Sequence, residues 1–178
     1  MSEQNSYNAN LKIEDHINGS QMDDALKKNA LDFVGFLKAN GLLFDIYDST
    51  TFTVDAEGVI CIYSVDDIPG WTFFIGGYDS VLLRGEYQDH PVDGELEEFV
   101  WAHIKPCFHF TKNIRESGGV ECGCGDQPGR SITIFGKGFD NVCHAALYFR
   151  NPEGGTLELM KRLALFWQKT NADAVKKD

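Results

Sequence analysis

The sequence predicts a single α+β domain in which an antiparallel sheet carries about three helices, mainly on one face. Segments with helical periodicity occur near the start, in the middle and at the end of the chain, and short apolar or alternating segments separate them. The connections between the short segments are brief, as in antiparallel hairpins. The regular strand–helix alternation that parallel crossovers require is absent from the sequence. The expected order is therefore helix, several strands, helix, two strands, helix.

Length and composition fit one domain. The chain has 178 residues, of which 43% are hydrophobic and 24% are charged, and these are ordinary values for a globular protein. We expect the domain to span residues 20–170. A polar leader without hydrophobic period, residues 1–19, and a short tail, residues 171–178, are expected to be disordered.

The charge of the chain restricts its partners. The sequence is acidic, with a net charge of -11 from 27 acidic and 16 basic residues, and the basic residues are scattered. Such a chain repels nucleic acid and anionic membranes, so we expect a small-molecule or protein partner and no nucleic acid or membrane. The leader lacks the apolar core of a signal peptide and no apolar run has membrane-spanning length. These features predict a cytoplasmic protein whose thiols are reduced.

The first predicted helix follows Ser20, which forms a pattern resembling a capping box with Asp23. The helix is expected to end at Asn40-Gly41. Its apolar residues recur at helical spacing: Leu26, Ala30, Phe33, Val34 and Leu37.

Short apolar or alternating segments then predict strands at 43–47, 51–54, 59–64, 71–75 and 81–84. Two turns are expected at 55–58 and 67–70, because glycine and proline supply the backbone angles that chain reversals need.

A second helix is predicted after Asp93, which has the residue type preferred at an N-cap. Pro106 is expected to end it. His103 falls on the apolar stripe of this helix, so we interpret it as a core residue rather than a base.

The segment 107–129 has no clear period and is rich in glycine, which indicates a long loop. A strand follows at Ile132 and Ile134, then a glycine-rich bend at Gly136-Lys137-Gly138, then a last strand marked by Leu147 and Phe149. The bend lacks the spacing of a phosphate-binding loop. The closing helix is predicted at about 156–169, with apolar residues on most of its surface.

One group of residues in and around this loop points to specific chemistry. Thiolate and imidazole groups are the ligands that Zn²⁺ prefers, and a bound metal offsets the entropy lost in ordering an irregular loop. We therefore predict a structural zinc site with four cysteine ligands, in which a histidine replaces any cysteine that cannot reach. The candidate residues are Cys107, Cys122, Cys124 and Cys143, with His109 and His144.

Two alternatives remain open for these cysteines. The Cys-Gly-Cys spacing of Cys122 and Cys124 is closer than in common zinc sites, so the cysteines are also consistent with reduced structural residues. A thiol redox pair made by Cys122 and Cys124 is the other alternative.

Three classes of function follow from these patterns. A non-catalytic binding protein is favoured by elimination, because the sequence has no Gly-x-Ser-x-Gly motif and no residue that we assign as catalytic. A thiol-dependent enzyme is the second class. A structural protein that acts as a homo-oligomer, for example a homodimer, is the third.

The last part of the chain also resembles a known group of proteins. The run Thr133-Ile134-Phe135-Gly136-Lys137-Gly138-Phe139-Asp140-Asn141-Val142-Cys143, with Phe149-Arg150-Asn151-Pro152 and the segment 157–163, carries the resemblance. It is similar to small bacterial proteins without an assigned function, in which a cysteine- and glycine-rich segment precedes such a run. The resemblance covers about the last 70 residues. A second cysteine usually follows the one matching Cys107 in that group, and this chain has Phe108-His109 there.

Overall fold

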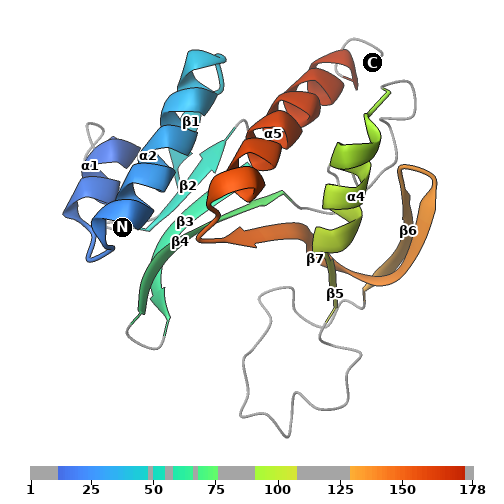
Figure 1. Cartoon of the computed structure of the whole chain (residues 1–178), viewed down its shortest axis with the longest axis horizontal. Coiled ribbons are helices and arrows are strands. Elements are labelled where there is room, and N and C mark those ends of the chain that lie inside the picture. Colours follow the sequence, from blue (N-terminus) through green and yellow to red (C-terminus); the bar gives the residue numbers. More distant parts are fainter. Residues whose placement is uncertain are drawn as a thin grey trace, which may run out of the picture.

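The computed structural model describes residues 12–47, 50–54, 58–65, 68–75, 91–107 and 129–174. In these residues, the strands pair antiparallel with their neighbours to form a sheet, and helices lie over one face of this sheet (Figure 1). The predicted α+β class, with one domain and helices mainly on one face, is therefore confirmed. The helices described are α1 (Ile13–Gly19), α2 (Asp24–Ala39), α4 (Gly94–His103) and α5 (Gly154–Ala174).

The sheet has the strand order β1-β2-β3-β4-β7-β5, and β6 pairs with β7. Leu147 of β7 pairs with both β4 and β5, and Val142 pairs with both β5 and β6. Because a strand has two edges, β4 and β6 lie along one edge of β7 and β5 lies along the other. The strands are β1 (Phe44–Ile46), β2 (Thr51–Val54), β3 (Gly58–Val65), β4 (Ile68–Ile75), β5 (Ile104–Pro106), β6 (Arg130–Ile134) and β7 (Lys137–Arg150). The strand predicted at 81–84 lies outside the described residues.

The core lies between the sheet and the helices. Strand side chains alternate between the two faces, and the inward residues of β4 pack against α2. The Phe33 ring lies 5.8 Å from that of Trp71 and 4.9 Å from that of Phe73, measured between centroids. All three side chains are fully buried. The alternating apolar pattern that predicted these strands therefore marks the face that the helices cover.

One predicted turn is wrong in its position. Pro69 and Gly70 belong to β4, where they pair with Ser64 and Tyr63 of β3, instead of forming the reversal. β7 pairs with β4 only from Thr72 onward. Pro69 therefore occupies a stretch of β4 where its missing N–H breaks no bond to β7, which is the setting in which strands accept proline.

The N-terminal prediction also needs correction. Residues 13–19, expected in a disordered leader, form α1, with Ile13 and Ile17 buried in the core. Ser20 closes this helix, since its Oγ donates to the Ile17 carbonyl at 2.7 Å. Asp23, not Ser20, caps α2 by accepting from the Leu26 N–H at 2.8 Å. A seven-residue helix with two isoleucines is too short to show a period.

The N-terminal end of α4 is tied to the middle of α5. Asp93 caps α4 as predicted, by accepting from the Leu96 N–H at 3.1 Å. Arg162 of α5 binds the carboxylates of both Asp93 and Glu95. α5 is longer than predicted at both ends, and it includes residues 171–174 of the expected tail. No helix among the described residues is long and apolar enough to span a bilayer.

Asn151 joins the sheet to α5. Its backbone lies in the left-handed region at φ 45°, which asparagine accepts better than most residues. Its Oδ1 accepts from the Trp71 N–H at 2.8 Å, and its N–H donates to the Trp71 carbonyl at 2.9 Å. A side chain at position 70 would meet Asn151 Oδ1 at 2.8 Å, so Gly70 leaves the space for this contact.

We expect Asn151→Ala to lower the free energy of unfolding by about 1–3 kcal/mol, the usual cost of leaving a buried donor without an acceptor. Asn151→Asp keeps an acceptor oxygen and a residue that accepts the same backbone angles, so it is the control. Urea denaturation of both variants measures the difference. Equal losses in the two variants would show that the bond to Trp71 is not the cause.

Candidate functional site

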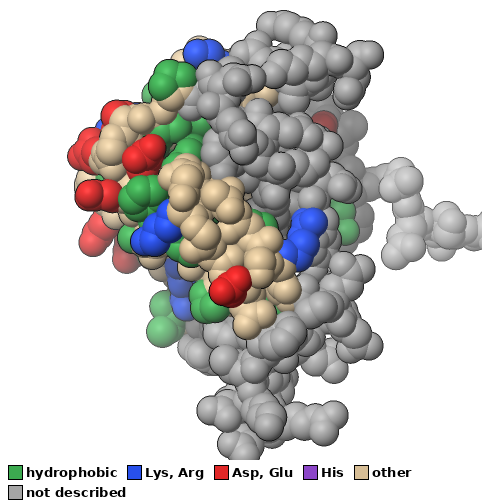
Figure 2. Space-filling model, turned by 90° about the vertical axis from the view of Figure 1, so that its right-hand side faces the viewer, with side chains coloured by type: hydrophobic (Ala, Val, Ile, Leu, Met, Phe, Trp, Pro, Cys, Tyr) green, Lys and Arg blue, Asp and Glu red, His purple; other side chains and the backbone are tan. Residues whose placement is uncertain are grey.

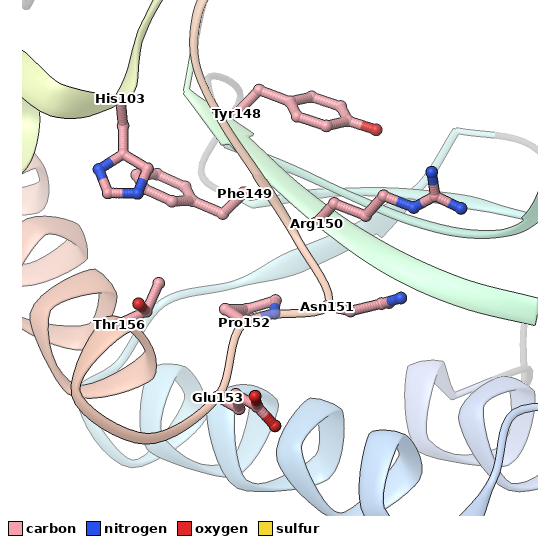
Figure 3. Close-up of a pocket in the computed structure, with 8 residues that line it drawn as sticks. All are labelled: His103, Tyr148, Phe149, Arg150, Asn151, Pro152, Glu153 and Thr156. Carbon is pink, nitrogen blue, oxygen red and sulfur yellow. The ribbon is translucent and has the colours of Figure 1, made fainter.

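A hollow of about 290 Å³ lies where α4 ends, β7 ends and α5 begins (Figure 3). Figure 3 shows the rings of His103 and Phe149 together on one side of β7, whereas Tyr148 and Arg150 project to the other side. The lining combines aromatic rings with hydrogen-bonding side chains, as ligand sites commonly do. It is made by His103, Tyr148, Phe149, Arg150, Asn151, Pro152, Glu153 and Thr156.

His103 is held firmly at the wall of this hollow. Its Nδ1 lies 2.7 Å from the Phe99 carbonyl oxygen, a distance at which the ring nitrogen donates a hydrogen bond. Its ring centroid lies 4.4 Å from that of Phe99 and 5.0 Å from that of Phe149, so the ring packs against both members of this stacked pair. The bond through Nδ1 leaves Nε2 for other partners. The sequence placed His103 correctly on the apolar stripe of the helix, but the side chain is half-buried and lines the hollow.

The other lining residues contribute different chemical groups to the hollow. Phe149 and Pro152 are buried and form an apolar floor. Thr156, in the first turn of α5, is half-buried and brings a hydroxyl group to the hollow. Arg150 and Glu153 are exposed and carry opposite charges at the rim. This arrangement suits a small molecule with a flat apolar part and hydrogen-bonding groups.

The predicted zinc ligands are only partly described. Cys107 is buried just after β5, and Cys143 is half-buried within β7. His109, Cys122 and Cys124 lie outside the described residues, as does the side chain of His144. Among the residues that the structure describes, no group of three or more histidine, cysteine or acidic side chains is placed to hold a metal ion.

The two ends of segment 108–128 meet on β7. The Cys107 N–H donates to the Asn141 carbonyl at 2.5 Å, and Arg130 pairs with Val142. Gly129 packs directly on Cys107, because a Cβ at position 129 would lie 2.5 Å from the Cys107 Cβ. The fold therefore brings the two ends of the cysteine-rich segment together on β7. Cys143 directly follows Val142, the residue of β7 that pairs with Arg130.

Cys143 lies in an irregular part of the sheet. Between the pairs Ile104–Leu147 and Pro106–Val142, four residues of β7 run beside the single residue Lys105 of β5. Such bulges redirect side chains and are frequent near functional sites. The Lys105 ammonium, opposite this bulge, lies 3.3 Å from the centroid of the Tyr148 ring. Burial lowers the pKa of Lys105, and Cys143 acts in the opposite direction.

A bend between β6 and β7 was predicted at 136–138; the reversal lies one residue earlier, at Phe135 and Gly136, and Lys137 and Gly138 already belong to β7. Phe135 and Gly136 both have positive φ there, and Ile134 pairs with Lys137.

On the face shown in Figure 2, acidic side chains gather at one edge, and the described lysine and arginine side chains lie apart from one another.

Comparisons with known proteins identified no relative of this chain. The chain matches no protein-family model, no curated protein and no solved structure.

Proposed function

We propose that this chain is a non-catalytic binding protein that holds a small aromatic molecule with a hydrogen-bonding group in the hollow between α4, β7 and α5. The observation that carries the proposal is the fixed His103 ring beside Phe149 and Thr156. A ring already held by the Phe99 carbonyl and by two aromatic neighbours loses little freedom when a ligand binds. The ligand's ring would lie on Phe149 and Pro152, and its polar group would meet His103 and Thr156.

Titration with free tyrosine, phenylalanine and 4-hydroxybenzoate, followed by NMR shifts of the full chain, tests this proposal. Thr156→Phe fills the hollow and is expected to weaken binding at least about tenfold, which corresponds to about 1.4 kcal/mol. Thr156→Ser keeps the hydroxyl and is expected to bind nearly as well as the unchanged chain. No saturable shift with any of the three compounds, or equal binding by the Thr156→Phe variant, would contradict the proposal.

A structural zinc site is the second part of the proposal. Two observations support the zinc site. The sheet brings both ends of segment 108–128 to the stretch of β7 that carries Cys143. Thiolates are also suitable donors for zinc. Cys107 and Cys143 would provide two ligands, and Cys122 and Cys124, or a histidine, the others. The metal would stabilise this end of the domain without taking part in a reaction.

Metal analysis of protein purified without a histidine tag tests the zinc site. We expect about one zinc per chain, and thiols that react with a thiol reagent only after a chelator removes the metal. The result that would contradict the zinc site is protein without metal whose five cysteines all react at once after unfolding. The cysteines would then be reduced structural residues.

A thiol-dependent enzyme is the alternative, and the position of Lys105 favours Cys143 as its nucleophile. A nearby ammonium group stabilises a thiolate relative to the thiol, and the thiolate is the reactive form. Under this alternative, Cys143 reacts with iodoacetamide near neutral pH much faster than a free cysteine does, and Lys105→Met slows it. Slow alkylation in both proteins would exclude this function.

We also infer a cytoplasmic location and no nucleic-acid partner. The odd number of cysteines, five, fits a compartment in which thiols stay reduced, and a net charge of -11 repels a phosphate backbone. A homodimer is the structural alternative. Light scattering tests it, because a dimer has twice the mass of the 19.9 kDa chain.

A further inference from the structure

A second hollow lies at the other end of the strand order, beside the edge strand β1. Its volume is about 370 Å³, and it lies where α1 begins, α2 ends and β1 pairs with β2. The buried side chains of Ile13, Leu42 and Phe52 contribute to its lining. Phe44 and Ile46 of β1 contribute from the strand. We call this hollow the β1 groove.

The apolar surface of the β1 groove continues onto exposed side chains. Leu43 is 71% exposed and Ile46 is 42% exposed, although both are large and apolar. Both line the groove. Water contact at these residues is unfavourable, and an apolar ligand chain would remove it.

The charged side chains that the structure describes in the lining all have one sign. Lys12 and Lys38 line the groove and, among the described residues, no acidic side chain does, in a chain whose net charge is -11. The Lys38 ammonium lies 2.6 Å from Glu14 Oε1 and 5.6 Å from the centroid of the Phe44 ring. An ammonium group has three N–H donors, so the bond to Glu14 leaves donors for a second anion. The groove therefore joins an apolar surface to a positive group.

We propose that the β1 groove binds an amphiphile with a single apolar chain and a carboxylate head, of the medium-chain fatty-acid type. The apolar chain lies on Ile13, Leu42 and Phe52 and covers Leu43 and Ile46. The carboxylate binds the ammonium groups of Lys12 and Lys38. This site is separate from the hollow at His103, and it takes a different class of ligand.

A second copy of the chain fits this surface less well. A symmetric antiparallel pair of β1 strands, Phe44–Ile46, places Asp45 opposite Asp45 of the other copy. Like charges directly opposite each other destabilise a strand pair, and two chains of charge -11 repel each other.

Titration of the full chain with decanoate, below the concentration at which decanoate forms micelles, tests the proposal. Calorimetry is expected to show one saturable site. Decylamine has the same chain and the opposite charge, and it is expected to bind at least about tenfold more weakly. Lys12→Gln is expected to weaken decanoate binding several-fold, and Thr156→Phe to leave it unchanged.

A matched pair of variants tests the position of the site. Leu43→Glu adds a negative charge in the groove, whereas Ile68→Glu adds it at a residue that is 60% exposed and does not line the groove. Only Leu43→Glu is expected to reduce decanoate affinity by about tenfold or more. Both residues are exposed, so neither change disturbs the core.

Three results would overturn the proposal. Equal affinity for decanoate and decylamine would show that the positive groups play no part. Equal losses in Leu43→Glu and Ile68→Glu would show general adsorption to the surface. A dimer mass in light scattering that decanoate leaves unchanged, together with an absence of decanoate binding, would assign the groove to a second copy of the chain.

Discussion

Replacing Phe149 by alanine is expected to lower the free energy of unfolding by about 3–5 kcal/mol, the usual cost of deleting a buried phenylalanine. The side chain is 2% exposed, and its ring is stacked on that of Phe99 at 5.3 Å with an angle of 4° between the planes. The same ring supports His103. Its loss leaves a cavity where the sheet, α4 and the hollow meet.

Urea denaturation followed by fluorescence measures this effect. Phe149→Leu keeps most of the apolar volume and is expected to lose clearly less stability than Phe149→Ala. Phe139→Ala, at a half-buried position of the same strand, is a control for the general cost of removing a phenylalanine. A loss below about 1 kcal/mol in Phe149→Ala would contradict the packing described here.

The second large effect is expected at Gly129, where alanine has no room. An added Cβ would lie 2.5 Å from the Cys107 Cβ and 2.8 Å from the Asn141 carbonyl carbon. The second of these atoms belongs to the backbone of β7, so the strand itself has to move. We expect Gly129→Ala to cost about 3 kcal/mol, at the upper end for overpacking.

Gly138→Ala is the matched control for this change, because a Cβ at position 138 meets no atom within 4 Å. It is expected to change stability by no more than about 0.5 kcal/mol. The Cys107 thiol, now buried, should also react faster with a thiol reagent in Gly129→Ala. Unchanged stability together with an unreactive Cys107 would show that the two ends of the segment are not packed together.

Features that depend on neighbouring residues could be predicted from the sequence. Short apolar or alternating segments predicted strands at 51–54 and 59–64, which the structure has as Thr51–Val54 and Gly58–Val65, because the side chains of a strand point to its two faces in turn. Asp93 was predicted to cap its helix because its side chain reaches an N–H three residues later. The bend at Gly136 follows from the positive φ that glycine accepts.

The position of the hollow could not be predicted, because its residues come from elements that are far apart in the chain. His103 and Thr156 line the same hollow only because α4 and α5 pack at the end of β7, and a lone histidine on an apolar stripe gives no sign of this. Asn151 likewise gains its role from Trp71, eighty residues away. The cysteine-rich segment was expected to be a loop, but its closure on Asn141 depends on the pairing of β5 and β6 with the two edges of β7.

Short elements and single residues depend even more on the tertiary structure. α1 forms because the core accepts Ile13 and Ile17, although a seven-residue helix is unstable by itself. Pro69 and Gly70, which favour a turn in isolation, lie in β4 because pairing with β3 outweighs their local preference. Local patterns thus predict where helices and strands can form, whereas the packing of distant segments places His103, Thr156 and the residues of the β1 groove together.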